Sequence, residues 1–468
     1  MLRACALVLA VLMAASKGIV PSACASQPNV VVILCDNLGF GDVACFQAQT
    51  KHRTPNLNRM AAEGIRLTSF YSTSGVCTPS RASLLTGCYP RRVGMHISAT
   101  GASVLQPVAA RGINPTEQTL AELLKEVGYV TTCIGKWHLG DQPEFLPTQN
   151  GFDSFFGIPY SEDMERGKVP GLDWPELPLL RNEKVIEAPA DAQYFTSRMT
   201  EEAVKFIADN RDRPFFLYFP EAAPGSRTIG YPGPEFLGKS ANGLYGDSVE
   251  ELDWSAGEIL NALKRYGLDD NTIVVWTSDN GALTRNPPQG SNAPFTGMGN
   301  STREGGQRMP CIVRWPNKIP QGGYCDKMCT MMDLLPTITR LCGAALPKAK
   351  IDGHDITPLL MGDLTATSPY DKTGFFYYQV KQLQAVRVKK WKLYLPLASP
   401  KPQALRLFDV QSDIAEQKDV SAKFPGLVAG MTALADRVRH ELGDNDQIGT
   451  GQRSAGEVAH PKPLLLTN

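Results

Sequence analysis

Two stretches of the chain decide its fold class: NVVVILC at residues 29–35 and NTIVVWTS at residues 271–278. Both are nearly unbroken apolar runs rich in β-branched residues, which is typical of strands buried on both faces of a parallel sheet. PFFLYF at 214–219 has the same character, and VTTCIG at 130–135 is a further strand candidate. These four runs predict the centre of a parallel sheet.

Helix-like segments lie between these strands, at residues 55–65, 119–129 and 246–267. The last of them is the clearest helix in the chain, and Gly267 is a natural C-cap for it. Strands and helices that alternate at this spacing predict an α/β fold with a doubly wound, mostly parallel sheet flanked by helices.

The character of the sequence changes after about residue 345. GFFYYQV, LQAVRVKKWKLYLP and LRLFDV read as short alternating strands, and a last helix is expected near 424–441. We therefore expect a smaller C-terminal antiparallel sheet subdomain. The predicted organisation is a signal peptide (1–25), a catalytic domain (26–345), the antiparallel subdomain (346–443) and a polar, mobile tail (444–468).

The first 25 residues have the pattern of an export signal. Arg3 precedes an apolar run at 4–15 that is shorter than the ~20 residues needed to span a bilayer. Ala23-Cys24-Ala25 is a small-x-small cleavage site, so the mature chain is expected to begin at Ser26. Lipoprotein cleavage before Cys24 is the alternative, which Pro21 disfavours. We expect an exported protein, in a periplasm, an extracellular space or a lysosome-like lumen, without a membrane span.

Charge and cysteine content narrow the possible functions. The 468 residues include 47 Lys+Arg and 47 Asp+Glu, a balance that argues against binding to nucleic acid or to an anionic membrane. Nine of the eleven cysteines remain after signal cleavage, so at least one is free or chemically special. Cys325 and Cys329 have no histidine nearby, which favours a buried pair or a local disulfide over a zinc site.

An acid and an amide follow each of the two deciding strands: Asp36-Asn37 and Asp279-Asn280. Ligands bind at the carboxyl edge of open α/β sheets, where these side chains would meet. Four oxygen-bearing groups suit a hard divalent cation, Ca²⁺ before Mg²⁺. The alternative is that both pairs are simply turn formers.

Two further motifs carry chemically active side chains. Cys77, in the loop Gly75–Arg81, lies beside Arg81 at the start of an expected helix, a position where a thiol can be reactive and an anion can be held. Lys136 and His138 follow a strand and should point to one side, as a cation for an oxyanion and a proton carrier. A structural cysteine and a structural histidine remain the alternatives.

With these motifs, the chain resembles the type I, formylglycine-dependent sulfatases of the alkaline-phosphatase-like superfamily, of the arylsulfatase A type. GVCTPSRASLLTG (75–87) matches the first family signature and GYVTTCIGKWH (128–138) the second. GIPYS (157–161) and REGGQRMPCIVRWP (303–316) also match in order and spacing. The resemblance covers essentially the whole mature chain.

The resemblance implies a role for each matching residue. Cys77 would be oxidised to formylglycine by a formylglycine-generating enzyme, and the hydrated aldehyde would attack sulfur. Arg81 and Lys136 would hold the nucleophile and the sulfate charge, and His138 would accept a proton. Ser161 would lie near the nucleophile as a substrate-binding residue. The residue at position 77 would also contact Ca²⁺, whose other ligands would be Asp36, Asn37, Asp279 and Asn280.

The chain departs from the family at three positions. Asn37 replaces a second aspartate, which removes one negative charge from the metal site. Gly225 stands where a histidine usually protonates the leaving alcohol, and no histidine occurs between His138 and His354. Gly299 stands where a lysine usually binds sulfate. Glu221 or Glu162 is a candidate replacement acid, and the candidate replacement cations are Arg227, Arg285 and Arg303.

The sequence therefore predicts an exported sulfuric ester hydrolase that acts on an aryl or carbohydrate sulfate, with a sulfated small molecule or glycan as its partner. One alternative is a phosphate or phosphonate ester hydrolase of the same fold. The other is a catalytically impaired binder of sulfated glycans, which the missing cations would fit.

Overall fold

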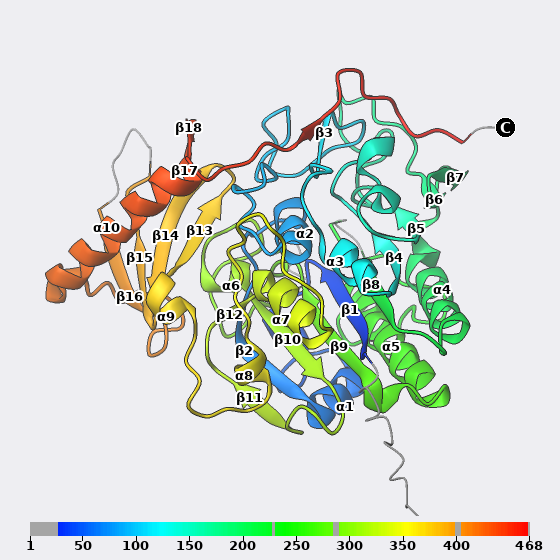
Figure 1. Cartoon of the computed structure of the whole chain (residues 1–468), viewed down its shortest axis with the longest axis horizontal. Coiled ribbons are helices and arrows are strands. Elements are labelled where there is room, and N and C mark those ends of the chain that lie inside the picture. Colours follow the sequence, from blue (N-terminus) through cyan, green and yellow to red (C-terminus); the bar gives the residue numbers. More distant parts are fainter. Residues whose placement is uncertain (1–26, 227–229, 284–289, 398–403, 467–468) are drawn as a thin grey trace, which may run out of the picture.

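The two deciding strands lie side by side at the centre of the main sheet (Figure 1). A computed structural model describes residues 27–226, 230–283, 290–397 and 404–466. Strand β1 (Asn29–Asp36) pairs in parallel with β9 (Thr272–Ser278) on one side and with β8 (Phe215–Pro224) on the other. The export segment predicted at 1–25 lies outside the described residues.

The main sheet is mostly parallel at its centre and mixed at its edges. Strands β4 (Val130–Lys136) and β5 (Ser154–Ile158) continue the parallel pairing beyond β8. On the other side, β10 (Arg308–Arg314) is antiparallel to both β9 and β2 (Ile65–Tyr71). The remaining strands of this sheet are β6 (Leu179–Arg181), β7 (Lys184–Glu187), β11 (Gly323–Cys325) and β12 (Cys329–Thr330).

Helices cover both faces of this sheet, as a doubly wound fold requires. Alternate residues of β1 enter two different apolar cores, Val30 and Val32 in one and Val31 and Ile33 in the other. The first core includes residues of α2 (Cys77–Thr86), α3 (Leu120–Glu126) and α7 (Leu334–Leu341). The second includes residues of α1 (Pro55–Glu63), α4 (Phe195–Asp209) and α5 (Gly243–Arg265).

A separate antiparallel sheet follows near the C-terminus, at the left of Figure 1. Its strands run in the order β13 (Phe375–Gln379), β14 (Gln382–Val388), β15 (Trp391–Tyr394) and β16 (Arg406–Asp409). Helix α10 (Pro425–Leu442) packs on this sheet and shares an apolar core with it. The short helices are α6 (Glu304–Gln307), α8 (Thr357–Leu360) and α9 (Tyr370–Thr373).

The segment after Asp444, which the sequence predicts to be mobile, instead packs back onto the larger part of the molecule. After the hairpin of β17 (Gly443–Asp444) and β18 (Gln447–Ile448), strand β19 (Gly456–Glu457) pairs with β3 (Arg111–Gly112). The Arg453 guanidinium also donates two hydrogen bonds to the Glu117 carboxylate, at 2.6 and 2.7 Å. A polar composition did not reveal the β19–β3 pairing or the Arg453–Glu117 contact, because each joins residues more than 300 positions apart.

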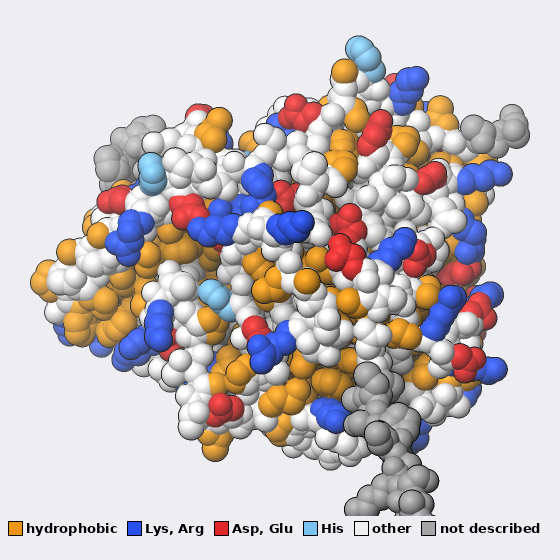
Figure 2. Space-filling view, viewed as in Figure 1, with side chains coloured by type: hydrophobic (Ala, Val, Ile, Leu, Met, Phe, Trp, Pro, Cys, Tyr) orange, Lys and Arg blue, Asp and Glu red, His pale blue; other side chains and the backbone are white. Residues whose placement is uncertain are grey.

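Other sequence expectations can be checked directly. All nine cysteines from Cys35 to Cys342 are free thiols, so Cys325 and Cys329 form a buried pair without a disulfide. Helix α1 ends at Glu63 and not at residue 65, because Ile65 begins β2. Within the described ranges, no helix has the length and apolar character to cross a membrane. On the face shown in Figure 2, acidic and basic side chains are interspersed.

Candidate active site

The two acid–amide pairs meet at the carboxyl edge of the sheet, as predicted. Asp36 is the last residue of β1, and Asp279 directly follows β9. The parallel register aligns Cys35 with Ser278, so the two carboxylates leave adjacent strands at the same level. The backbone N–H of Asn37 donates to Oδ1 of Asp279 over 3.1 Å, which links the two turns.

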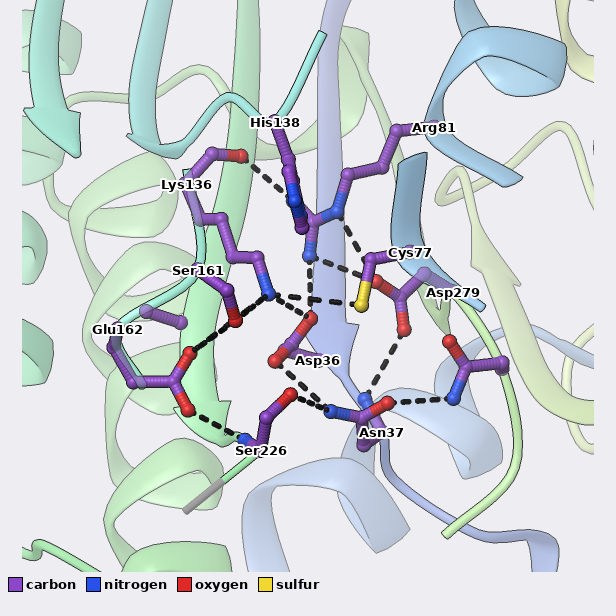
Figure 3. Close-up of polar contacts among 12 residues, drawn as sticks. Asp36, Asn37, Cys77, Arg81, Lys136, His138, Ser161, Glu162, Ser226 and Asp279 are labelled. Atoms are coloured by element: carbon purple, nitrogen blue, oxygen red, sulfur yellow. Dashed lines mark hydrogen bonds and ion pairs between the residues drawn. The ribbon is translucent and has the colours of Figure 1, made fainter. Parts of the chain in front are cut away.

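Arg81 lies between these carboxylates and is fully buried (Figure 3). Its Nη2 donates to Oδ1 of Asp36 at 3.0 Å and to Oδ2 of Asp279 at 2.8 Å. Burial opposes ionisation of Asp36, but the charges of Lys136 and Arg81 outweigh it and hold the pKa of Asp36 at about 2. Burial and the neighbouring Asp36 charge raise the pKa of Asp279 to about 7. The two carboxyl groups therefore differ in pKa, although they lie side by side.

Cys77 is the first residue of α2 and faces the same cluster. The Lys136 ammonium donates hydrogen bonds to three groups: Oδ1 of Asp36 at 2.8 Å, Oγ of Ser161 at 2.9 Å and Sγ of Cys77 at 3.6 Å. Burial, followed by the negative charge of Asp36, raises the pKa of the Cys77 thiol well above its usual value. The thiol therefore stays protonated near neutral pH, and an unmodified Cys77 would be a poor nucleophile.

The cluster fits a hard cation. One ligand atom each from Asp36, Cys77 and Asp279 lies within 4.8 Å of the other two. Oδ1 of Asn280 is buried and has no hydrogen-bond partner among the described residues, while its amide nitrogen donates to Oδ1 of Asn37 at 2.6 Å. Carboxylate and amide oxygens are the ligands that Ca²⁺ prefers, and an unpartnered buried oxygen is what such an ion would satisfy.

His138 is held in one tautomer by the backbone. Its Nε2 lies 2.9 Å from the carbonyl oxygen of Leu105, which only accepts, so Nε2 carries the hydrogen. Nδ1 is then an acceptor, and it is buried with no partner in the described part of the chain. Burial and the Lys136 charge hold the pKa of His138 well below its usual value. The imidazole is therefore neutral and able to accept a proton at Nδ1.

Ser161 and Glu162 extend the cluster on the side away from His138 (Figure 3). Oγ of Ser161 accepts a hydrogen bond from Lys136 and donates to Oε2 of Glu162 at 2.9 Å. Ser226, a residue that sequence reasoning missed, donates its backbone N–H to Oε1 of Glu162. Its hydroxyl also accepts a hydrogen bond from the Asn37 amide at 3.0 Å. The only sequence signal for Ser226 was its place beside Gly225.

Other predicted residues lie away from this cluster. Glu221 accepts a hydrogen bond from the Cys35 thiol over 3.7 Å, and Cys35 belongs to the core under α5. Arg303 contacts Oγ1 of Thr296 at 3.4 Å and lines a cavity of about 500 Å³ beside the C-terminal sheet. In the described residues, no hydrogen bond joins Arg303 to the cluster. The candidate cations Arg227 and Arg285 lie outside the described residues.

Gly299 leaves no room for the lysine that the family usually has. A Cβ atom at this position would lie 2.5 Å from the carbonyl oxygen of Gly281 and 3.1 Å from Nδ2 of Asn280. A side chain would therefore require the loop to move away from the candidate metal site.

The fold and the site together define a class of enzyme. A buried nucleophile position, two fixed cations, a neutral proton acceptor and a set of oxygen ligands converge at the edge of a doubly wound sheet. Cations and a metal ion can stabilise negative charge as it develops on the oxygens of a transferred group. This arrangement is that of a hydrolase acting on esters of an anionic acid.

Comparisons with known proteins give the family. Residues 28–344 match the family described as Sulfatase, and residues 302–442 match the family described as N-sulphoglucosamine sulphohydrolase, C-terminal. The chain belongs to the sulfatase family, as a type I sulfatase, and it is a sulfuric ester hydrolase.

Individual relatives agree with this assignment. N-acetylgalactosamine-6-sulfatase of Canis lupus familiaris is 38% identical over 400 residues, which cover 82% of this chain and 74% of the relative. Arylsulfatase A of Homo sapiens is 38% identical over 401 residues, covering 80% and 75%. The crystal structure of Ps i-CgsB superimposes with a TM-score of 0.77 at 27% identity, covering 88% of this chain and 92% of that one.

Proposed function

We propose that this sulfatase is an exported enzyme that removes sulfate from carbohydrate or aryl sulfate esters, using a formylglycine made from Cys77 and a bound Ca²⁺ ion. The observation that carries the proposal is the environment of Cys77. Its sulfur lies within 4.8 Å of the candidate metal-ligand oxygens of Asp36 and Asp279 and 3.6 Å from the Lys136 ammonium. The raised pKa of this thiol disfavours direct use of sulfur as the nucleophile.

The two added groups would supply the nucleophile and a Lewis acid. Formylglycine in its hydrated form offers a hydroxyl oxygen for attack on sulfur, and formylglycine-generating enzyme would install it during maturation. Ca²⁺, held by Asp36, Asn37, Asp279, Asn280 and the residue at position 77, would polarise a sulfate oxygen.

The chain's own residues would orient and neutralise the reacting groups. Arg81, bound to both Asp36 and Asp279, would hold the two carboxylates in place beside the ion. Lys136, which contacts Cys77, would bind the nucleophile and the negatively charged sulfate group. Nδ1 of His138 would accept the proton that the nucleophilic hydroxyl loses, since its Nε2 is already committed to Leu105.

The substrate class rests on the relatives and on one cavity. Relatives named for N-acetylgalactosamine 6-sulfate and for aryl sulfates are equally similar to this chain. A structure of Ps i-CgsB was solved in complex with a neocarrahexaose. Arg303 and Arg406 line the cavity of about 500 Å³ beside the loop 297–303. Gly299 of this loop lies against Asn280, so the cavity is next to the candidate metal site, and we propose that the remainder of the substrate binds there.

The proposal is tested by replacing Cys77 with alanine. Sulfate release from nitrophenyl sulfate and from a 6-sulfated monosaccharide should fall to background in Cys77→Ala, while the protein remains folded by circular dichroism. Cys45→Ala is the matched control, because Cys45 is a partly exposed thiol outside the cluster. Residual activity of about a tenth of the wild type in Cys77→Ala would overturn the proposed nucleophile.

The same assay separates the alternatives. Nitrophenyl phosphate and a phosphonate monoester should be hydrolysed more slowly than nitrophenyl sulfate. Chelation should abolish activity, and added Ca²⁺ should restore it. Faster hydrolysis of the phosphorus esters would identify a phosphoesterase, and glycan binding without hydrolysis would identify an impaired binder.

A further inference from the structure

In this family, the residue at one position after β8 usually protonates the leaving group. Here that residue is Gly225, and other groups already fill the space that a side chain would need. Gly225 follows β8 and has a φ of 84°, a conformation that strains residues with a side chain. A Cβ atom built on Gly225 would lie 2.5 Å from Oε1 of Glu162 and would also collide with the hydroxyl of Tyr231. The Glu162 carboxyl group therefore occupies the place toward which a side chain at position 225 would point.

The Glu162 carboxyl group is held against the reaction centre. It is fully buried, accepts hydrogen bonds from Oγ of Ser161 and the N–H of Ser226, and has its Oε2 3.8 Å from Nζ of Lys136. The same Lys136 ammonium contacts the sulfur of Cys77. Figure 3 shows Glu162 and His138 at different sides of the cluster, so an acid and a base would not compete for one position.

We infer that Glu162 is the general acid of this enzyme, which protonates the leaving-group oxygen of the sulfate ester in place of the histidine absent at Gly225. This inference rests on the proposed function. Glu162, the glutamate of the stretch GIPYSE, would thereby take the proton-donating role that a side chain at position 225, just after β8, could have filled.

The proton transfer balances with the bond changes at sulfur. As the bond between sulfur and the nucleophilic oxygen at position 77 forms, the bond between sulfur and the alcohol oxygen breaks. The electron pair of the broken bond moves to the alcohol oxygen, and the proton of the Glu162 carboxyl joins it. Glu162 is left as a carboxylate, and a proton from solvent restores it before the next turnover.

The environment of Glu162 keeps a proton available near neutral pH. Burial raises its pKa to about 7; the Lys136 charge acts to lower it, while the charges of Asp163 and Asp36 act to raise it. An acid of this strength is partly protonated at neutral pH and close to the optimum for proton transfer. Because the protonated form is the active one, its contribution should be present below pH 7 and fall as pH rises through about 7.

Two other groups near this position are weaker candidates. Glu221 has a pKa raised to about 8 by burial, but its carboxyl group contacts Cys35 in the core under α5. Tyr231 donates its phenolic hydrogen to the carbonyl oxygen of Ala222, so that proton is committed to the backbone.

The inference is tested with a series of aryl and alkyl sulfates of graded leaving-group pKa, assayed as kcat/KM, which reports steps up to the loss of the alcohol. The variants are Glu162→Gln, with Glu221→Gln and Tyr231→Phe as matched controls. The wild type should show a shallow dependence of rate on leaving-group pKa. Glu162→Gln should steepen it, with a loss of about 10²–10⁴-fold for alkyl sulfates and little loss for the most acidic phenols.

A second readout is the pH profile for an alkyl sulfate. The wild type should lose kcat/KM above pH 7, and Glu162→Gln should lack this limb while unfolding at a similar temperature. An unchanged slope in Glu162→Gln, or a steeper slope in Glu221→Gln or Tyr231→Phe alone, would overturn the inference. The proposed function would survive that result, because hydrolysis of acidic aryl sulfates and its loss in Cys77→Ala test it separately.

Discussion

Asn37 shows how one residue changes the charge balance of the site. Its amide nitrogen donates to Oδ2 of Asp36 at 3.1 Å and to Oγ of Ser226 at 3.0 Å, while its amide oxygen accepts from Asn280. An aspartate at position 37 could make neither donation. It would place a second negative charge beside Asp36, so the amide stabilises the cluster when no metal ion adds to the positive charge of Arg81 and Lys136.

This balance predicts that Asn37→Asp binds Ca²⁺ about tenfold or more tightly than the wild type, because an added carboxylate strengthens the attraction to a hard cation. The metal-free variant should unfold at a lower temperature than the metal-free wild type. Titration calorimetry measures the first effect and differential scanning calorimetry the second. Equal or weaker Ca²⁺ binding in the variant would place residue 37 outside the ligand set.

At the scale of elements, the end of the chain supports the segment that positions His138. The tail strand β19 pairs with β3, and the next residue after β3, Ile113, donates its N–H to the carbonyl oxygen of Leu139. The Leu105 carbonyl that fixes the His138 tautomer lies a few residues before β3. The tail therefore braces one side of the site although it contributes no reacting group.

The Arg453–Glu117 ion pair is the point at which to test this bracing. Arg453→Ala should lower the free energy of unfolding by about 1–3 kcal/mol, because it leaves the buried Glu117 carboxylate without its bidentate partner. Arg437→Ala is the control, since Arg437 is exposed on α10 and, among the described residues, its side chain bonds only to a carbonyl of its own helix. Urea unfolding of both variants gives the comparison. Equal stability of the two would mean that the tail does not brace the fold.

Element boundaries also explain why the sequence could not choose between Glu162 and Glu221. The apolar run predicted a strand over 214–219, but β8 continues to Pro224. Glu221 therefore lies within the strand, and its side chain enters the core under α5. No local pattern marks where a strand with a polar end stops, because the continuation depends on pairing with β1.

At the scale of the molecule, the sequence predicted what local pattern determines. Strands β1, β4, β8 and β9 and helices α1, α3 and α5 follow from apolar runs and periodicity, and the acid–amide pairs follow from their places at strand ends. Helices α4 and α7 were not predicted. Strands β2 and β10 went unrecognised, since β2 begins at Ile65, within the segment predicted as a helix, and β10 contains Pro310. Their antiparallel pairing joins residues more than 230 positions apart.

The features of the candidate site likewise divide into those that the sequence could predict and those that it could not. Side chains that belong to motifs could be named in advance, including Cys77, Arg81, Lys136 and His138. Contacts made by the backbone could not, because a carbonyl such as that of Leu105 leaves no trace in the residue type. The bridge that Arg81 forms between two strand ends also required the fold.

The central claim is that Cys77 becomes formylglycine, and mass spectrometry of one peptide tests it most directly. Trypsin releases residues 67–81, LTSFYSTSGVCTPSR, in which Cys77 is the only cysteine. In protein made with the formylglycine-generating enzyme, this peptide should have the mass expected for an aldehyde in place of the thiol, and it should react with a hydrazide. In protein made without that enzyme it should retain the thiol and react with iodoacetamide. An unmodified thiol at position 77 in protein that hydrolyses sulfate esters would contradict the account.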